Sequence, residues 1–328
     1  MGVGPRRACS SSPMVLMTNE PTIVSLLASA TEIVCGLGLR HRLIGRSHEC
    51  DYPEDVADLP VLSAPKVDIN SASGEIDRQV REVVRDGLSV YDIRVDELGR
   101  LQPDLIVTQD QCEVCAVSLT DVEGALCQVT LKDTKICTLH PNNIDDVTAD
   151  FQQVADASGV PERGRELVNA FTRRLADIEQ RSAGLSSRPR VAMIEWVDPV
   201  MVAGGWIPEL VRVAGGEPVI VESPEAFKTV EWSEIAAADP DVVVILPCGY
   251  DLSKTLGELD DDVLAVALES VPAVRRGKCY VADGNAYFNR PGPRLADSAE
   301  MLAALLHPDL FPDALARYRD CFTVWTRD

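Results

Sequence analysis

Short apolar runs that alternate with helical patterns are the feature of this sequence that most limits its possible folds. The alternation is typical of α/β domains, because neighbouring parallel strands need a crossover connection, usually a helix, between them. The runs of the first half predict strands at residues 22–26, 43–46, 105–108 and 136–139. The runs of the second half predict strands at residues 190–195, 201–203, 242–246 and 279–282.

A long helical pattern separates the two sets of strands, from about residue 144 to residue 183. Pro161 begins its longer part, at a position that favours proline in helices. The apolar residues that then recur at spacings of four, four and three, on one helix face, are Leu167, Phe171, Leu175 and Ile178. A helix of ~22 residues is ~33 Å long, so the pattern predicts a helix that spans two lobes.

We therefore predict an α/β protein with two Rossmann-like lobes, parallel sheets and a long backbone helix that joins the lobes. The predicted units are a disordered extension at 1–19, an N-terminal lobe at 20–142, the bridging helix at 143–184 and a C-terminal lobe at 185–328. A repeated pattern supports two related lobes. In each half a Pro-Asp turn and an apolar strand precede a loop with a cysteine, Cys112 in the first and Cys248 in the second.

Ligands of open α/β sheets bind beyond the carboxyl ends of the strands, so residues that follow the predicted strands are candidates for a site. The candidates for ligand contacts are His48, Glu49, Tyr52, Trp206, Trp232, Tyr250, Tyr287, Asn289 and Arg290. Their aromatic rings would form flat walls for a large planar ligand. Arg290, in a proline-rich turn, would anchor a carboxylate, amide or phosphate. Core packing or a turn hydrogen bond is the alternative for each residue alone.

Four cysteines also follow predicted strands: Cys50, Cys112, Cys115 and Cys248. Cys112 and Cys115 form a Cys-x-x-Cys turn, in which two thiolates can hold one metal ion or part of an iron–sulfur cluster. Cys50 and Cys248 would complete a four-thiolate set. A redox-active dithiol and chemically inert thiols are the alternative interpretations.

The charge balance excludes some classes of partner. The chain has 31 basic and 52 acidic residues, a net charge of −21. This argues against nucleic acid and against an anionic membrane surface, because both attract Lys and Arg. No run approaches the ~20 apolar residues of a membrane-spanning helix, so we expect no membrane insertion. The abundance of Asp and the scarcity of Lys fit a halophilic source or an ordinary acidic protein from a GC-rich genome.

The first 19 residues contain no apolar stretch of the ~7–15 residues that an export signal needs. We therefore expect a cytoplasmic protein, with this segment as a disordered extension or the product of an upstream start codon. In a reducing cytoplasm, structural disulfides among the ten cysteines are not expected.

Several motifs resemble those of the vitamin B12-binding substrate-binding proteins of ABC importers. The motifs are VSLLASATE at 24–32, DYP at 51–53, PDLIV at 103–107, AGG at 214–216 and PDVVV at 240–244. The resemblance covers about residues 20–310. It implies two Rossmann-like lobes, a ligand in the cleft between them and no catalytic activity. It also implies that Tyr52 contacts the corrin ring, that Trp206 and Trp232 lie in segments that line the cleft, and that Glu32 is structural.

The leading hypothesis is therefore a protein that binds a corrinoid such as cobalamin, or another metal chelate, as cargo for an ABC importer permease. Proteins of this shape are usually monomers. The second hypothesis is a cytosolic metalloprotein or enzyme on the same fold, in which the four cysteines hold an iron–sulfur cluster or zinc. A third is a redox or soft-metal sensor that uses the Cys112–Cys115 dithiol alone. The cysteine-rich strand ends and the missing export signal suggest a cytosolic branch of the family.

Overall fold

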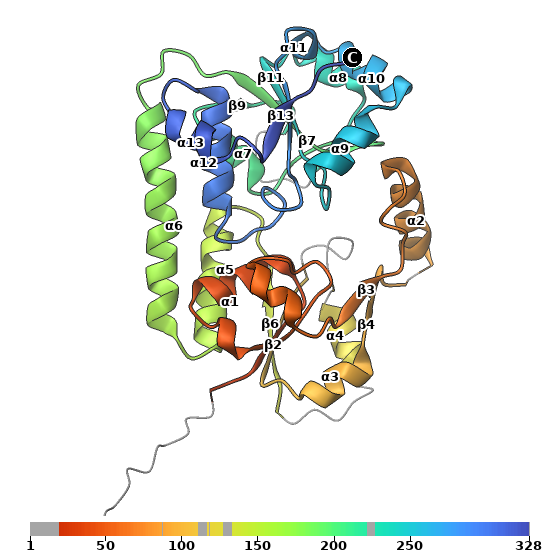
Figure 1. The fold of residues 1–328 in the computed structure, drawn as a ribbon, viewed down its shortest axis with the longest axis vertical. Helices are drawn as coiled ribbons and strands as arrows, with labels where there is room; N and C mark the ends of the chain where they lie inside the picture. The colour runs from red at the N-terminus through yellow and green to blue at the C-terminus, as the bar shows by residue number, and fades with distance from the viewer. Residues whose placement is uncertain are drawn as a thin grey trace, which may run out of the picture.

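Two α/β lobes lie one above the other in the computed structural model, with a pair of helices along one side (Figure 1). The structure describes residues 20–86, 88–110, 117, 119–126, 133–221 and 227–327. Within these residues no helix is both long enough and apolar enough to cross a membrane.

The first lobe is built on a four-stranded parallel sheet of order β2-β1-β5-β6. Its strands are β1 (Ile23–Ser25), β2 (Leu43–Arg46), β5 (Leu105–Gln109) and β6 (Lys135–Leu139). All residues of β1 and β5 are buried, as expected for central strands with both faces covered. The helices of this lobe are α1 (Ala28–Gly36), α3 (Val95–Leu101) and α4 (Leu119–Leu126), with 3-10 turns η1 (Arg40–Arg42) and η2 (Glu54–Asp58). The four predicted strands are confirmed to within a residue at each end.

A small arm projects from the first lobe. It consists of a two-stranded antiparallel ribbon, β3 (Ser63–Pro65) with β4 (Tyr91–Ile93), and of helix α2 (Ser73–Arg85), which lies between these strands in the sequence. The sequence did not predict this arm, since three-residue strands leave no periodic pattern to recognise.

The predicted bridging stretch is two helices, α5 (Ile144–Ala157) and α6 (Pro161–Ser182), that lie side by side (Figure 1). The chain turns between them at Gly159, whose φ of 75° suits a residue without a side chain. Phe151 of α5 packs edge-on against Phe171 of α6, with the ring centroids 5.3 Å apart. Helix α5 packs on α1 and β6 of the first lobe, whereas α6 continues to the second lobe. Only α6 is therefore the bridge.

The second lobe contains a seven-stranded sheet of order β10-β8-β7-β11-β12-β13, with β9 beside β7. Its strands are β7 (Arg190–Val197), β8 (Val200–Val202), β9 (Glu217–Pro218), β10 (Lys228–Thr229), β11 (Val242–Ile245), β12 (Cys279–Ala282) and β13 (Phe322–Val324). The centre, β7-β11-β12, is parallel, but β8 and β13 run antiparallel to their neighbours. This corrects the prediction of a parallel sheet at the edges. Two residues, Asp198 and Pro199, join β7 to β8. A connection of this length cannot form the crossover that parallel neighbours need, so the two strands are antiparallel.

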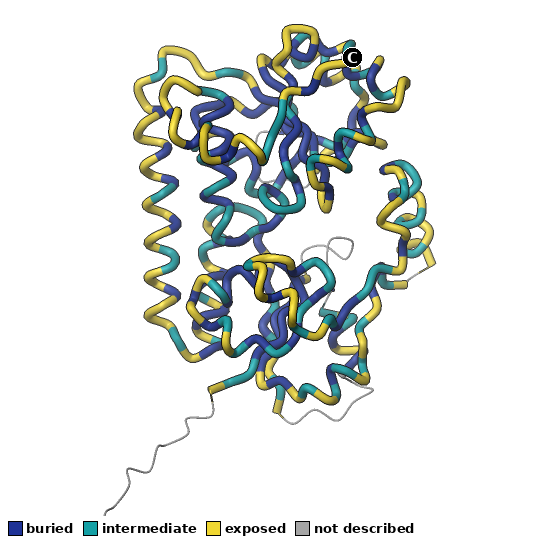
Figure 2. Tube along the Cα trace, in the orientation of Figure 1, coloured by how far each residue is buried: buried dark blue, intermediate teal, exposed yellow. Residues whose placement is uncertain are grey.

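Seven helices cover the second lobe in the described part of the chain: α7 (Ile207–Val213), α8 (Trp232–Ala237), α9 (Leu252–Leu259), α10 (Asp262–Glu269), α11 (Pro272–Arg275), α12 (Leu295–Leu306) and α13 (Pro312–Arg317). Helix α12 is almost entirely buried and packs against α6 and α7 (Figure 2). One buried cluster runs from β1 through α5 and α6 to α12. The two lobes therefore share part of one core along the side where α6 lies.

Candidate ligand-binding site between the lobes

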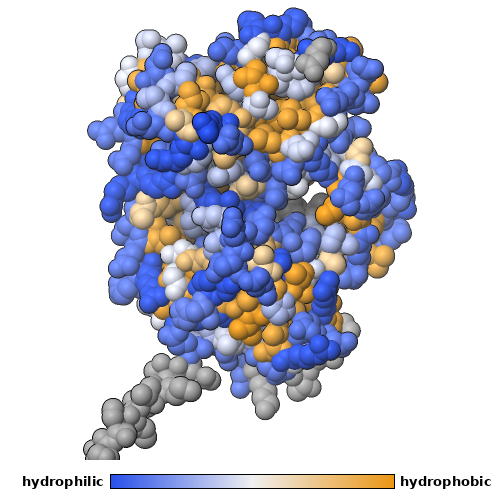
Figure 3. Space-filling model, viewed as in Figure 1, coloured by the Kyte–Doolittle hydropathy of each residue, from blue (hydrophilic) through white to orange (hydrophobic). Residues whose placement is uncertain are grey.

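Loops that follow the carboxyl ends of parallel strands in both sheets lie where the two lobes meet (Figure 1). Loops that follow β2 and β12 contact each other through Asp51 and Arg290. The segment after β6 contacts α7, where Glu209 accepts a hydrogen bond of 2.8 Å from the backbone N–H of Ile144. On the other side an opening remains beside α2 (Figure 3). We call the space between these strand ends the inter-lobe cleft.

Four charged side chains join the lobes at the edge of this cleft, and we call them the inter-lobe ion network: Glu32 and Asp51 of the first lobe with Arg290 and Arg294 of the second. Arg290 donates to both carboxylate oxygens of Asp51, at 2.5 and 3.0 Å. Arg294 donates to both oxygens of the buried Glu32, at 2.6 and 3.0 Å. Arg290 also lies 3.6 Å from Glu32. Both arginines are thus bidentate, the strongest form of such a pair.

Burial and charge have opposite effects on the titration of this network. Burial opposes ionisation of Asp51, but the hydrogen bonds and charge of Arg290 hold the pKa of Asp51 below its ordinary value. Arg290 is itself 7% exposed. Its pKa lies above the ordinary value, because Asp51 and Glu32 outweigh the opposing effect of burial. Burial raises the pKa of Glu32, against the hydrogen bonds and charges of Arg294 and Arg290. The pair that is charged at neutral pH is therefore Asp51 with Arg290.

Arg290 and Asn289, both predicted to contact a ligand, are engaged inside the protein. Besides Asp51, the Arg290 guanidinium donates to the backbone oxygen of Glu49 and to Asn285. The Asn289 amide donates to the backbone oxygens of Leu246 and Gly284, at 2.9 and 3.0 Å. These contacts fix the loop after β12 against the first lobe. They leave Arg290 as a residue that holds the cleft together rather than a free anion-binding group.

Tyr52 is the best placed of the predicted aromatic residues. Its side chain is 46% exposed, and the Arg294 guanidinium lies 4.0 Å from the centroid of its ring. Because Arg294 is also bound to Glu32, the ring is held at the cleft edge while much of its surface stays accessible. Such a cation–π contact with a fixed cation orients the ring. The arrangement suits stacking on a flat ligand.

Two more of the predicted aromatic side chains, Trp206 and Tyr287, lie in the part of the second lobe that is close to the first; the Arg294 guanidinium is 5.4 Å from the Tyr287 ring centroid. Trp206, at the start of α7, is half-buried and donates from Nε1 to the backbone oxygen of Phe288, at 2.8 Å. Tyr287 is half-buried and packs edge-on against Tyr318, with the ring centroids 6.4 Å apart. Strand β8 runs antiparallel to β7, so the carboxyl end that Trp206 follows lies at the opposite edge of the sheet from the carboxyl ends of β7 and β11. Trp206 nevertheless lies near the first lobe, because α7 begins close to Asn142.

His48 and Glu49 follow β2 and are both half-buried. The Nδ1 atom of His48 lies 2.8 Å from Ser63 Oγ, and burial lowers the pKa of its imidazole to about 4. Burial raises the pKa of Glu49 to about 7, with the charge of Arg290 opposing the shift. At neutral pH His48 is therefore uncharged, and Glu49 is close to half protonated. These two side chains suit hydrogen bonds to neutral polar groups of a ligand.

Tyr250 and Trp232 are placed differently from the prediction. Tyr250 is 2% exposed, with Trp196 edge-on at 5.3 Å and the Lys254 ammonium 3.7 Å above its ring. Its ring is part of the second lobe's interior, which corrects its predicted place in an open wall. Trp232 begins α8 and is half-buried against the core of the second lobe.

Of the four cysteines predicted to hold a metal ion or cluster, the structure describes two, Cys50 and Cys248. Cys50 is buried in the core, where Thr31 donates a hydrogen bond of 3.0 Å to its sulfur, and burial raises the pKa of its thiol. A neutral buried thiol is a poor metal ligand. Cys248 is exposed, and Cys112 and Cys115 lie outside the described residues. Among the residues that are described, no group of three or more His, Cys, Asp or Glu is arranged to hold a metal ion.

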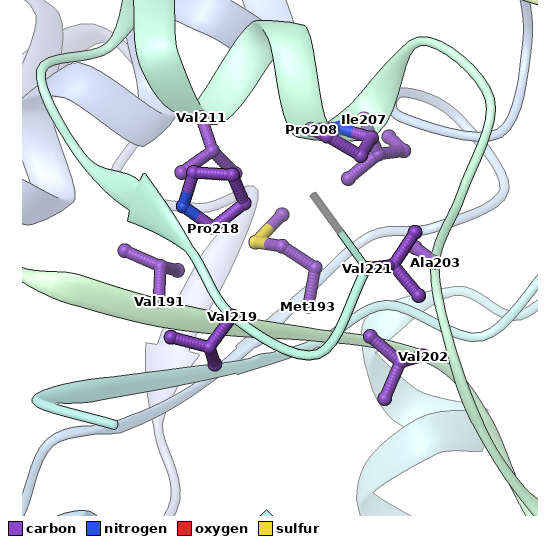
Figure 4. Close-up of a pocket in the computed structure, with 10 residues that line it drawn as sticks. All are labelled: Val191, Met193, Val202, Ala203, Ile207, Pro208, Val211, Pro218, Val219 and Val221. Carbon is purple, nitrogen blue, oxygen red and sulfur yellow. The ribbon is translucent and has the colours of Figure 1, made fainter. Parts of the chain in front are cut away.

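A hollow in the second lobe does not contribute to the site. It lies between α7 and the strands. The empty space between its atoms adds up to about 160 Å³, but it is nowhere wide enough to hold a water-sized sphere. Its lining is apolar throughout and consists of Val191, Met193, Val202, Ala203, Ile207, Pro208, Val211, Pro218, Val219 and Val221 (Figure 4). It is a narrow gap in core packing.

Some residues that shape the cleft were not recognised from the sequence. Asp51 is bonded to a residue 239 positions away, and Ser73 of α2 is bonded to Glu258 of α9, 185 positions away. Neither pair leaves a local motif. The only available signal was the pair of arginines in the turn at 289–294.

Known proteins resemble most of the chain. The family model described as periplasmic binding protein matches residues 23–286. An uncharacterized ABC transporter substrate-binding lipoprotein of Bacillus subtilis is 23% identical, over 93% of this chain and 86% of its own length. A vitamin B12-binding protein of Yersinia pestis is 24% identical, over 85% of this chain and 84% of its own length. The structure of a periplasmic heme-binding protein from Roseiflexus sp. RS-1 matches with a TM-score of 0.64 and 22% identity, over 89% of this chain and 99% of that one.

Proposed function

Because the chain belongs to the periplasmic binding protein family, we propose that it is a substrate-binding protein of an ABC importer and that its ligand is a corrinoid. The similarity to an ABC transporter substrate-binding lipoprotein and to a vitamin B12-binding protein, each over more than four fifths of both chains, supports this role. An ABC-type permease is the partner that the role implies. Binding and release, rather than catalysis, are the proposed activity.

The exposed ring of Tyr52 is the observation that carries the proposal. It lies at the cleft edge under the Arg294 guanidinium, with 46% of its side chain accessible. We place Trp206 and Tyr287 on the second lobe's side of the same cleft, because Tyr287 lies 5.4 Å from the Arg294 guanidinium and the residue before Trp206 approaches Asn142 of the first lobe. A corrin ring is large and nearly flat, so aromatic surfaces on two sides would bind it mainly by burial of apolar area.

The polar groups of the cleft favour a corrinoid over a haem. A corrin carries neutral amide side chains, which match the uncharged His48 and the partly protonated Glu49. A haem carries two carboxylates and would need free cations. Arg290 and Arg294 are already paired with Asp51 and Glu32, and Glu49 adds a further acidic group. Haem, for which the similar Roseiflexus protein is named, is therefore the second candidate.

A spectroscopic titration tests the proposal. Cyanocobalamin and haemin are added in turn to the purified protein, and the shift of their visible bands and the quenching of tryptophan fluorescence are recorded. We expect cyanocobalamin to bind one per chain, and haemin to bind at least tenfold more weakly. No binding of cyanocobalamin at 100 μM, on the order of 100 times a micromolar Kd, would refute the corrinoid proposal.

A variant of Tyr52 localises the binding. We expect Tyr52→Ala to weaken cyanocobalamin binding about tenfold or more, the usual loss for an aromatic anchor. Tyr52→Phe keeps the ring and its contact with Arg294, so its affinity is expected to stay within about threefold of the wild type. Equal affinities of the wild type and Tyr52→Ala would remove Tyr52 from the site.

A further inference from the structure

The lobes also touch on the side of the cleft opposite α6, where the tip of the α2 arm reaches the second lobe (Figure 1). The backbone N–H and the hydroxyl of Ser73 both donate to one oxygen of Glu258 in α9, at 2.8 and 2.5 Å. The Lys254 ammonium donates to the backbone oxygen of Ile69. Gly74 lies so close to Asp198 that an added Cβ would come 2.3 Å from its carboxylate. We call these contacts the α2 latch.

The second lobe supplies the N-terminal cap that α2 lacks. The residue at the N-cap position is Ala72, which has no side-chain acceptor for the free N–H groups of the first turn. Ser71 precedes it, but its hydroxyl donates to Asp68. The Glu258 carboxylate takes the acceptor role from across the cleft, and its negative charge suits the positive end of the helix. The cap therefore exists only while the lobes are closed.

Helix α2 is attached to its own lobe mainly at its other end. Its fully buried residues are Ser73 and Ile76, both in the first turn, next to the second lobe. Farther along, Val80 and Val83 are partly buried against the core of the first lobe, and much of the helix surface is exposed (Figure 2). The arm is joined to the rest of the lobe through the two-stranded ribbon β3-β4, which pairs with no other strand in the described part of the chain. Val90 and Tyr91 of the ribbon segment are buried in the core of the first lobe, so the base of the arm is fixed and any movement would be confined to its tip.

The helix also carries contacts that would keep it folded when released. Arg78 pairs with Glu75 and Glu82, and Arg81 pairs with Asp77, at spacings of three and four residues. Such pairs stabilise an exposed helix by themselves. The turn before α2 is fixed independently, because Asp68 accepts hydrogen bonds from the Asn70 N–H and from the hydroxyl of Ser71. Release of Glu258 would thus free the tip without unfolding the arm.

We propose that α2 is a latch that opens and closes the side of the inter-lobe cleft opposite α6. Closed, it joins the lobes through Glu258 and Lys254 next to the opening visible beside α2 (Figure 3). Open, it lets a bulky ligand pass, while the ion network and α6 keep the lobes together on the other side. The latch itself is a property of the protein alone, whereas its effect on a ligand rests on the proposed function.

Hydrogen–deuterium exchange of the protein without ligand tests the latch. Glu258→Ala removes the acceptor of the Ser73 N–H, and we expect peptides that cover residues 70–78 to exchange about tenfold faster, the usual effect of losing a hydrogen bond to a charged group. Glu258→Gln keeps an acceptor oxygen and is expected to restore most of the protection. The control is Glu179→Ala, an exposed glutamate on α6, which should leave these peptides unchanged. Unchanged exchange in Glu258→Ala would overturn the latch.

Stopped-flow kinetics with cyanocobalamin tests the effect on the cleft. We expect Glu258→Ala to raise the association and dissociation rate constants together, each about fivefold or more, with little change in Kd, because a gate alters the path and not the bound state. Faster exchange with unchanged rate constants would overturn the gating role. If the wild type binds no cyanocobalamin, the proposed ligand is wrong, and the exchange experiment alone decides on the latch.

Discussion

Two of the contacts between the lobes of this protein, the inter-lobe ion network and the α2 latch, differ greatly in construction. Along the α6 side, the inter-lobe ion network is buried at Glu32 and Arg290 and uses bidentate guanidinium–carboxylate pairs. At the α2 latch, one carboxylate caps a helix end and one ammonium reaches a backbone oxygen, and both Glu258 and Lys254 are only partly buried. The same two lobes thus have one strong and one weak connection.

The difference follows from desolvation. A buried charge that loses its partner is left uncompensated in a medium of low dielectric, so breaking such a pair costs about 3–5 kcal/mol. A partly exposed charge regains water when its partner leaves, so the net cost is about 0–1 kcal/mol. The ion network is therefore suited to hold the lobes permanently, and the latch is suited to repeated opening. Three predictions test this contrast, in order of expected effect.

Arg290→Met is expected to have the largest effect. It removes the buried hydrogen bonds of the guanidinium to Asp51, Asn285 and the backbone oxygen of Glu49, and it leaves the buried Glu32 with Arg294 alone. The loss of these charge-assisted hydrogen bonds should lower the free energy of unfolding by about 3 kcal/mol. Urea denaturation followed by circular dichroism measures the change. Arg78→Met on exposed α2 breaks two surface pairs and serves as the control, with an expected loss within about 0.5 kcal/mol. Similar losses in the two variants would mean that burial does not distinguish these contacts.

Glu49→Gln is expected to change how stability depends on pH. The folded-state pKa of Glu49 is raised from 4.5 to about 7, so folding favours its protonated form. Its stabilising effect is fully present below pH 4.5 and is lost as pH rises through 7. The variant should therefore gain stability relative to the wild type by about 2.5 kcal/mol between pH 5 and pH 8, because most of the change from 4.5 to about 7 is expressed in this range, at about 1.4 kcal/mol per pKa unit. A constant difference across this range would show that Glu49 titrates normally.

Glu258→Ala is expected to have the smallest effect on global stability. Its carboxylate bonds one residue of the arm, and the helix retains its own ion pairs. The free energy of unfolding should change by less than about 0.5 kcal/mol, although local exchange in α2 rises. A loss near that of Arg290→Met, in the same urea experiment, would show that the latch is a permanent joint.

Much of the fold is predictable from this sequence because its signals are local. Buried parallel strands such as β5 and β11 are short runs of apolar residues, and Pro161 marks the start of α6. The long amphipathic pattern that follows Pro161 also predicts the helix that bridges the two lobes. The sequence also placed the start of the longer part at Pro161, but it assigned the whole stretch 143–184 to one bridging helix; the turn at Gly159 sends α5 back along α6, and a single glycine does not reveal that reversal.

The site is less predictable because its contacts are distant in sequence. The strand-end rule predicts Tyr52 and His48 beside the cleft, since their positions depend only on β2, and their part in ligand binding stays a prediction. It misjudged Tyr250, because the sequence does not reveal that Trp196 and Lys254 cover its ring. It also did not reveal that Arg290 is satisfied by Asp51, because pairing across 239 residues depends on how two complete lobes are oriented.

A crystal structure of the protein with cyanocobalamin is the most direct test of the central claim, that the ligand is a corrinoid held between the lobes. The account predicts the corrin ring in the inter-lobe cleft, with one face on Tyr52 and with Trp206 and Tyr287 at the second lobe's side. Its amide side chains should lie within hydrogen-bond distance of His48 or Glu49. A corrin bound outside the cleft, or a cleft that stays empty in crystals soaked at saturating concentration, would contradict the account.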